Sequence, residues 1–251
     1  MIWATIWQAF GAAISLPLYF ARHLDWLNQT SVQPQAVSEA SSQALPFSFA
    51  LGAIIPAIIG MLPAWIEPST RSSRTQQIIL AAWQPDPLWV SMIQHSLVAI
   101  ISWHAKNKER KPHRWARTSF LLAAASSAIG HLYVKTVILT STNCIYRFTR
   151  MYVPSLSSGP SKTTNVLVRG PWLFLQYDLI IISLSSLSWV YLLLRRLHYD
   201  GVPTRIRLVA YLLLGTLTIG SGATVSLALF WREGQLQRLR DMKKTSRGEK
   251  R

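Results

Sequence analysis

Residues 45–66 read LPFSFALGAIIPAIIGMLPAWI and contain no charged side chain. A helix of this length rises about 33 Å at roughly 1.5 Å per residue, which is enough to cross the hydrocarbon layer of a bilayer. Half of the 251 residues are hydrophobic and only 14% are charged, and most Lys and Arg lie between apolar runs. A soluble helical domain would interleave charged and apolar residues along each helix. The sequence therefore indicates an all-α fold, a polytopic transmembrane helical bundle.

Six apolar segments are long enough to be membrane spans. They cover residues 2–21, 45–66, 77–103, 118–139, 171–194 and 208–231. A seventh helix would arise if the proline-containing third segment were split. We expect 1–231 to form a single transmembrane domain and the basic segment 232–251 to be disordered or to lie on the lipid surface. The first twenty residues carry no Lys or Arg, so we expect a retained span there rather than a cleaved signal peptide.

Composition excludes several classes of protein. The formal net charge of +16 comes from basic connections between apolar segments, which is typical of membrane proteins and does not indicate a nucleic-acid partner. A single cysteine, Cys144, excludes an intramolecular disulfide and a cysteine zinc cluster. The six histidines form no HxxH or HxxxH pair, and no Asp-rich DDxxD or NDxxD motif is present. We therefore expect no metal and no cofactor.

The third segment is interrupted by polar residues and contains WQPDPLW at 83–89. Each proline removes a backbone donor, and Asp86 before Pro87 resembles an N-cap followed by a first helical residue. Either a short interfacial helix precedes a span that starts at Pro87, or the helix is broken inside the membrane beside a cavity. We predict an interruption between Gln84 and Pro87, with Asp86 capping the next helix and a flanking tryptophan facing a cavity.

Asp178 lies inside the fifth segment, roughly 10 Å below its start. A carboxylate at membrane depth marks either a functional site or a structural ion pair. His131 and Lys135 lie one turn apart in the fourth segment, and the expected topology would let them meet Asp178. Lys135 would then neutralise Asp178 and join two helices, or Asp178 would donate a proton. A close cation favours the ionised carboxylate, so direct pairing would oppose proton donation.

Isolated acids among many aromatic residues, without metal ligands, fit carbocation chemistry on a lipophilic substrate. A neutral carboxylic acid can protonate an alkene or an epoxide, and aromatic faces stabilise the resulting cation. The alternative is a small-solute transporter or channel, because such proteins also place acids and broken helices around a cavity.

Five stretches, in order along the chain, resemble the fungal integral-membrane terpene cyclases of meroterpenoid pathways, especially the ascochlorin/ascofuranone type. They are SLPLYFARHL (15–24), LPFSFALGAIIPAIIGMLP (45–63), AAWQPDPLWVSMIQ (81–94), FLQYD (174–178) and FWRE (230–233). The resemblance implies a multi-pass, metal-independent cyclase of the endoplasmic reticulum. Such an enzyme would protonate an alkene or terminal epoxide of a farnesylated substrate, an isomerase or lyase type of reaction. Relative to that family the N-terminal segment is short, so a truncated start is also expected.

The resemblance implies catalytic roles for Asp178, Glu233 and His23, although the six-span count puts His23 on the opposite side of the membrane from Asp178. We expect the other polar and aromatic residues of the spans to contribute to substrate binding. These residues are Tyr19, Trp83, Gln84, Asp86, Trp89, Gln94, His131, Trp172, Gln176 and Tyr177.

Overall fold

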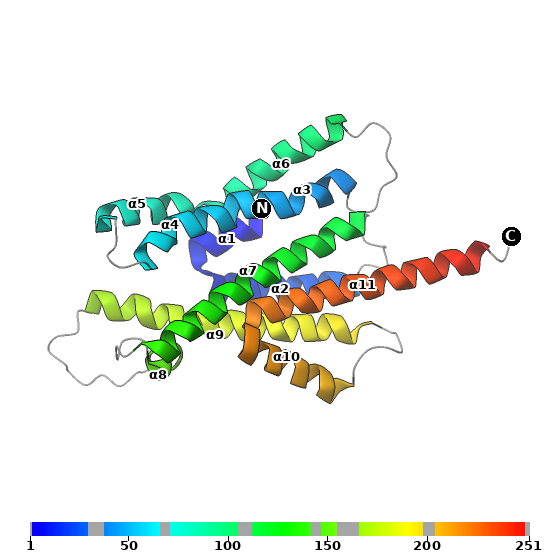
Figure 1. Ribbon diagram of the computed structural model, residues 1–251. Coiled ribbons are helices and arrows are strands. Elements are labelled where there is room, and N and C mark those ends of the chain that lie inside the picture. Colours follow the sequence, from blue (N-terminus) through cyan, green and yellow to red (C-terminus); the bar gives the residue numbers. More distant parts are fainter. Residues whose placement is uncertain are drawn as a thin grey trace. The chain divides into compact units, whose positions relative to one another are not determined.

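The computed structural model describes residues 2–29, 38–65, 71–104, 112–141, 147–154, 166–197 and 204–248. Within these ranges the regular structure is entirely helical (Figure 1), which confirms the all-α prediction. Cys144 lies outside them. Contacts group the chain into two compact units. Unit 1 holds residues 1–9, 32–122 and 229–251, and unit 2 holds 10–31 and 123–228.

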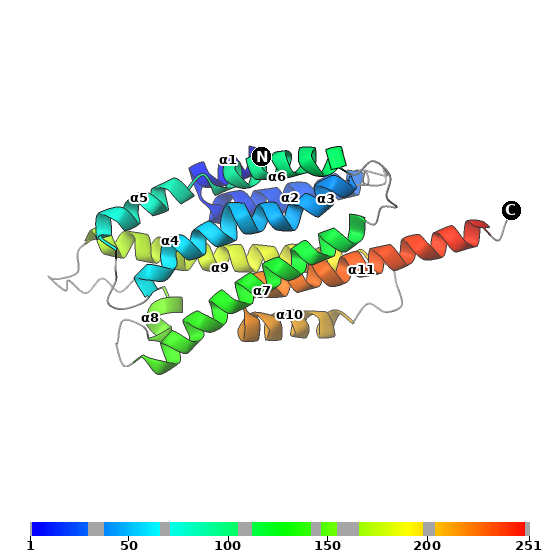
Figure 2. The ribbon, with the colours of Figure 1, turned by 45° about the horizontal axis from the view of Figure 1, so that its top comes forward.

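Unit 1 is built around two antiparallel helical arms. Its helices are α1 (Ile2–Phe10), α3 (Glu39–Phe49), the π-helical segment η1 (Ala50–Ile54), α4 (Ile55–Trp65), α5 (Ser73–Trp83) and α6 (Asp86–His104). The first arm runs from α3 through η1 to α4, and the second returns with α5 beside α4 and α6 beside α3 (Figure 2). Ser38 and Ser72 start α3 and α5, because each hydroxyl accepts a backbone N–H three residues later.

Unit 2 is built around a parallel helix pair. Its helices are α2 (Ala12–Gln29), α8 (Phe148–Tyr152), α9 (Val166–Arg195) and α10 (Arg205–Ile219), while α7 (Pro112–Thr140) and α11 (Ser221–Gly248) contribute to both units. Helices α2 and α9 lie side by side (Figures 1 and 2). They run parallel, because contacts join Ala13 to Asp178 and His23 to Trp189. The buried side chains of this unit include Val190, Leu193 and Leu194 on α9 and Leu208 and Leu212 on α10.

Three helical stretches are long and apolar enough to cross a membrane, namely Glu39–Gly60, Arg114–Thr140 and Gly170–Arg195. They contain most of the expected second, fourth and fifth spans. The first, third and sixth expected spans are each broken into two helices, so the count of six long spans is not confirmed. The breaks lie at Gly11, at Gln84 and Pro85, and at Gly220.

The last helix, α11, continues through most of the basic segment 232–251, to Gly248. Packing explains part of this order. The Gln235 side chain is buried, and the Arg117 guanidinium of α7 lies 4.1 Å from the centre of the Phe230 ring. A cation over an aromatic face adds attraction to the buried contact.

Candidate active site

Asp178 on α9 binds the start of α2. Gly11 has φ +85, a conformation that favours glycine, and it separates α1 from α2. The Ala13 amide is therefore one of the first amides of a new helix, which lack partners inside that helix. It donates to Asp178 Oδ1 at 2.8 Å. Asp178 thus caps α2 from another helix, and its Oδ2 has no hydrogen bond among the described residues.

Lys135 and His131 do not meet Asp178, contrary to the expectation. The Lys135 ammonium donates to the Leu217 carbonyl in the last turn of α10, where a cation is favourable. The His131 ring lies against Gly220, and its Nε2 is buried with no hydrogen-bond partner in the part of the chain that the structure describes. Both residues instead contact the backbone at the break between α10 and α11. The structure records no Lys135–Asp178 ion pair within the described ranges.

Gln176 and Trp172, expected to bind substrate, hold α8 against α9. Gln176 is 5% exposed, and its Nε2 donates to the Arg150 carbonyl at 2.6 Å and to the Met151 carbonyl at 3.2 Å. Trp172 Nε1 donates to the same Arg150 carbonyl at 3.1 Å. The polar groups of both residues are therefore used in helix packing. The neighbouring Tyr177 is exposed.

His23 belongs to an aromatic cluster at the other end of the α2–α9 pair. Trp189 Nε1 donates to His23 Nδ1 at 3.2 Å, Phe20 stacks on Trp189 with ring centres 4.6 Å apart, and Tyr19 stacks on His23 at 6.0 Å. Ten residues of α2 separate His23 from the amide that binds Asp178, which is about 15 Å along the helix. His23 and Asp178 therefore lie at different levels of unit 2.

Sequence reasoning missed Trp189 and Phe20. A signal for Trp189 was present, because it follows Asp178 by eleven residues and residues at that spacing share one face of a helix. The partner helix and its register were not predictable, so Phe20 carried no signal beyond its aromatic character.

Glu233, the third expected catalytic residue, belongs to unit 1. Its carboxylate lies 3.6 Å from the Arg240 guanidinium, seven residues further along α11. Neither unit by itself brings together the three residues expected to be catalytic. Among the described residues, no three His, Cys, Asp or Glu side chains are grouped so that they could hold a metal ion.

The predicted interruption of the third segment is confirmed at Gln84 and Pro85. The Ala82 carbonyl, near the end of α5, accepts from Trp89 Nε1 at 3.1 Å. The Trp89 indole therefore provides a hydrogen bond to the Ala82 carbonyl, which has no partner within α5 because the helix ends there. Trp83 Nε1 is buried and has no partner among the described residues, while the Gln84 side chain is exposed.

Asp86 does not cap α6, contrary to the expectation. The Pro85 carbonyl accepts the first helical bonds of α6, and Asp86 Oδ1 instead accepts from Gln8 Nε2 of α1 at 2.9 Å. Asp86 lies outside the three helices that are apolar enough to span a membrane. Burial raises the pKa of the Asp86 carboxyl, and the hydrogen bond from Gln8 opposes this shift.

Gln94 joins α6 to α3. Its Nε2 donates to the Ser41 carbonyl at 2.8 Å, and its Oε1 accepts from the Ser48 hydroxyl at 2.6 Å. Both ends of the amide are satisfied by α3, so this residue positions helices and presents no open polar group.

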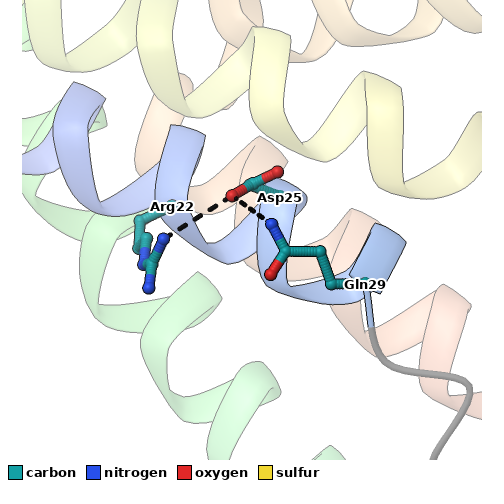
Figure 3. Close-up of polar contacts among 3 residues, drawn as sticks. All are labelled: Arg22, Asp25 and Gln29. Carbon is teal, nitrogen blue, oxygen red and sulfur yellow. Dashed lines mark hydrogen bonds and ion pairs between the residues drawn. The ribbon is translucent and has the colours of Figure 1, made fainter.

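Asp25 offers a contrast on the exposed part of α2. It lies 3.6 Å from Arg22 and accepts from Gln29 Nε2 at 2.9 Å (Figure 3). All three residues lie on one helix, and exposed pairs of this kind contribute little to stability. Asp25 is therefore a suitable control position for substitutions of the other aspartates.

Comparison with known proteins gives one family and several relatives. A match to the CtvD domain family covers residues 1–236. A terpene cyclase DEP1 from Fusarium langsethiae is 27% identical over 93% of this chain and 68% of its own length, and a terpene cyclase DEP1 from Alternaria brassicicola is 26% identical over 93% and 69%. The terpene cyclase penA from Penicillium crustosum is 28% identical over 89% of this chain and 62% of its own length. No solved structure matches the chain significantly.

Proposed function

We propose that this chain, which belongs to the CtvD domain family, is a membrane-bound terpene cyclase. The three relatives above are each named as a terpene cyclase, and each alignment covers most of this chain. These names favour an enzyme over the transporter or channel that the sequence left as an alternative. The three apolar helices support a multi-pass membrane protein. The endoplasmic reticulum is proposed from the resemblance to fungal integral-membrane cyclases.

The proposed reaction is a proton-initiated cyclisation of a farnesylated substrate. A carboxylic acid gives its proton to an alkene carbon or to the oxygen of a terminal epoxide, and in the epoxide a C–O bond then breaks. The carbocation is attacked by an internal alkene, which forms a ring and a new cation. A base finally removes one proton from carbon, so the product is an isomer of the substrate and no nucleotide or metal takes part.

The observation that carries this proposal is the position of Asp178. Its carboxyl group lies in an apolar helix, and the Ala13 amide holds Oδ1 in place. Among the described residues Oδ2 has no hydrogen-bond partner, so the proton of the acid would lie on this oxygen, against the preference of the Ala13 amide at the start of α2 for the ionised carboxylate. A fixed orientation of the acid lowers the entropy cost of reaching the reactive geometry.

The aromatic cluster around His23 supports the same chemistry from the other end of the α2–α9 pair. Stacked rings such as Phe20 and Trp189 offer faces that attract a cation without reacting with it. We propose that His23 orients Trp189 within this cluster. A catalytic role for Glu233 rests on the family resemblance, and its ion pair with Arg240 would first have to open.

The test uses membranes that contain the whole chain, incubated with a farnesyl-phenol or its terminal epoxide without added metal or nucleotide. We expect a cyclised product with the mass of the substrate. Asp178→Asn keeps an oxygen for the Ala13 amide but has no acidic proton, so we expect a loss of about 100-fold or more. Asp25→Asn is the matched control and should keep full activity.

Two results would overturn the assignments. Wild-type membranes that accumulate the protein but cyclise neither substrate would contradict the cyclase, and flux of a small solute in vesicles would then favour the transporter. Full activity of Asp178→Asn would contradict Asp178 as the acid while leaving the cyclase intact.

A further inference from the structure

The start of α7 and the second half of α11 form a basic surface within unit 1. The Arg117 guanidinium lies 4.1 Å from the centre of the Phe230 ring, and a Cβ on Gly234, one turn further along α11, would lie 3.8 Å from Arg117 Cζ. Residues 112–122 and 229–248 together carry eight Arg or Lys side chains and two acids. Two helices of unit 1 therefore contribute to one strongly positive surface.

Arg117 has no anionic partner in the part of unit 1 that the structure describes. Glu233, the nearest acid on α11, lies 3.6 Å from Arg240 instead. Arg117 Nε is buried without a hydrogen bond, while the side chain as a whole is half-buried, so its terminal nitrogens remain accessible to a ligand. The Phe230 ring attracts the cation without neutralising it. A planar guanidinium matches two oxygens of one oxyanion, so Arg117 is suited to bind a carboxylate or a phosphate.

Gln235, the residue after Gly234, is a second polar side chain without a partner. It is 6% exposed, and its Oε1 is buried with no hydrogen bond among the described residues. Leaving a buried amide without a partner costs free energy. A half-turn of the amide would place its NH2 group, which is a donor, where Oε1 now lies. Gln235 can therefore add a second donor to an anion that Arg117 binds.

The surroundings of Arg117 fit a membrane lipid better than a soluble anion. Arg117 lies in the first turn of Arg114–Thr140, a stretch that is apolar enough to cross a membrane. Trp115 lies two residues earlier, and tryptophan favours the boundary between lipid headgroups and acyl chains. Leu121, one turn further into the stretch, is 44% exposed. A lipid phosphate can thus reach Arg117 while an acyl chain of the same lipid covers Leu121.

We propose that Arg117 binds the phosphate of an anionic phospholipid, with Gln235 as a second donor. The guanidinium donates to two phosphate oxygens while its face stays on the Phe230 ring. The other basic side chains of this surface attract an anionic headgroup from a longer distance. They favour it over a zwitterionic headgroup, whose own cation they repel. The site lies in unit 1 alone, and it does not depend on the proposed cyclisation.

The experiment measures lipid binding to the whole chain, purified in detergent, by native mass spectrometry. Phosphatidylinositol and phosphatidylcholine with the same acyl chains are added in equal amounts, and the ratio of the two bound lipids is recorded. For the wild type we expect a preference for phosphatidylinositol of about 10- to 100-fold, the range for hydrogen bonds to a charged group. The ratio compares two lipids on one folded protein, so a lower yield of a variant does not alter it.

Arg117→Gln should reduce the ratio by about 10-fold or more, and Gln235→Leu by about 10-fold, because each removes a hydrogen bond to the phosphate. Arg117→Lys keeps the charge but loses the planar fork, so it should also lose most of the preference. The matched control is Arg114→Gln, which removes the same charge from an exposed side chain one turn earlier in α7. It should reduce the ratio by less than about 5-fold, because only long-range attraction is lost.

Three results would count against the site. A wild-type ratio near one, or equal reductions in Arg114→Gln and Arg117→Gln, would show that Arg117 forms no specific phosphate site. Displacement of phosphatidylinositol by an excess of inorganic phosphate would show that the site takes a free anion, which overturns the lipid as its occupant. An unchanged ratio in Gln235→Leu would contradict the role of Gln235 as a second donor.

Discussion

The two units break their helices by different means. In unit 2 the breaks lie at Gly11 and Gly220, whose φ values are +85 and +92, and side chains from other helices bind the exposed backbone groups. Asp178 accepts from α2 after the first break, and Lys135 donates to α10 before the second. In unit 1 the break lies at Pro85 and is closed by its own neighbours.

Asp178 in unit 2 and Asp86 in unit 1 therefore contribute differently to the stability of the fold. Asp178 has a structural role, because its carboxylate accepts a hydrogen bond from a backbone amide at the start of α2. Asp86 is bound by the side chain of Gln8 and can be replaced without leaving a backbone amide unsatisfied. Substitutions at Asp178 should therefore affect folding strongly, and substitutions at Asp86 should affect it less.

Gly220→Ala should give the largest effect. A Cβ at this position would lie 2.8 Å from His131 Cγ, and the positive φ disfavours any L side chain. Strain of about 1–2 kcal/mol and overpacking of about 1–3 kcal/mol together predict a loss of about 3 kcal/mol in the free energy of unfolding. The free energies of unfolding of the wild type and of Gly220→Ala are measured by denaturant titration in mixed micelles.

The control for this substitution is Gly130→Ala in α7. A Cβ there meets nothing within 4 Å, so the same change should leave stability equal or raise it by about 0.5–1 kcal/mol. Equal losses for the two variants would show that the glycine break in unit 2 does not need its tertiary contacts.

Asp178→Ala should give the second largest effect. It leaves the Ala13 amide at the start of α2 without an acceptor, which predicts a loss of about 1–3 kcal/mol in the free energy of unfolding. Asp178→Asn keeps an acceptor and should lose less than half as much. If the two variants are equally stable, the carboxylate does not cap α2, and the contrast with Asp86 fails.

The sequence predicted the helices whose apolar runs are uninterrupted and the one break that proline marks. Residues 118–139 and 171–194 lie within α7 and α9, and the interruption at Gln84 and Pro85 follows from the missing donors. The breaks at Gly11 and Gly220 carried no such signal, because glycine is common within membrane helices.

The candidate site was predicted less completely than the helices. Asp178 stood out as an acid in an apolar run, but its partner is the backbone amide of Ala13, which has no signature in the sequence. The expected partner, Lys135, was chosen from helix order and depth. That reasoning does not determine the direction in which a side chain points, and Lys135 in fact binds the Leu217 carbonyl.

Trp89→Phe should give the smallest of these effects, because the unit 1 break depends on one local hydrogen bond. The substitution keeps an aromatic ring but removes the N–H that binds the Ala82 carbonyl at 3.1 Å, so we expect a loss of about 1 kcal/mol in the free energy of unfolding. Trp103→Phe, at a side chain that is 76% exposed, controls for the smaller ring and should have little effect. The prolines still forbid a continuous helix, so α5 and α6 should remain separate. A loss at Trp89 as large as that of Gly220→Ala would show that the proline break also depends on distant packing, and the distinction between the two units would be lost.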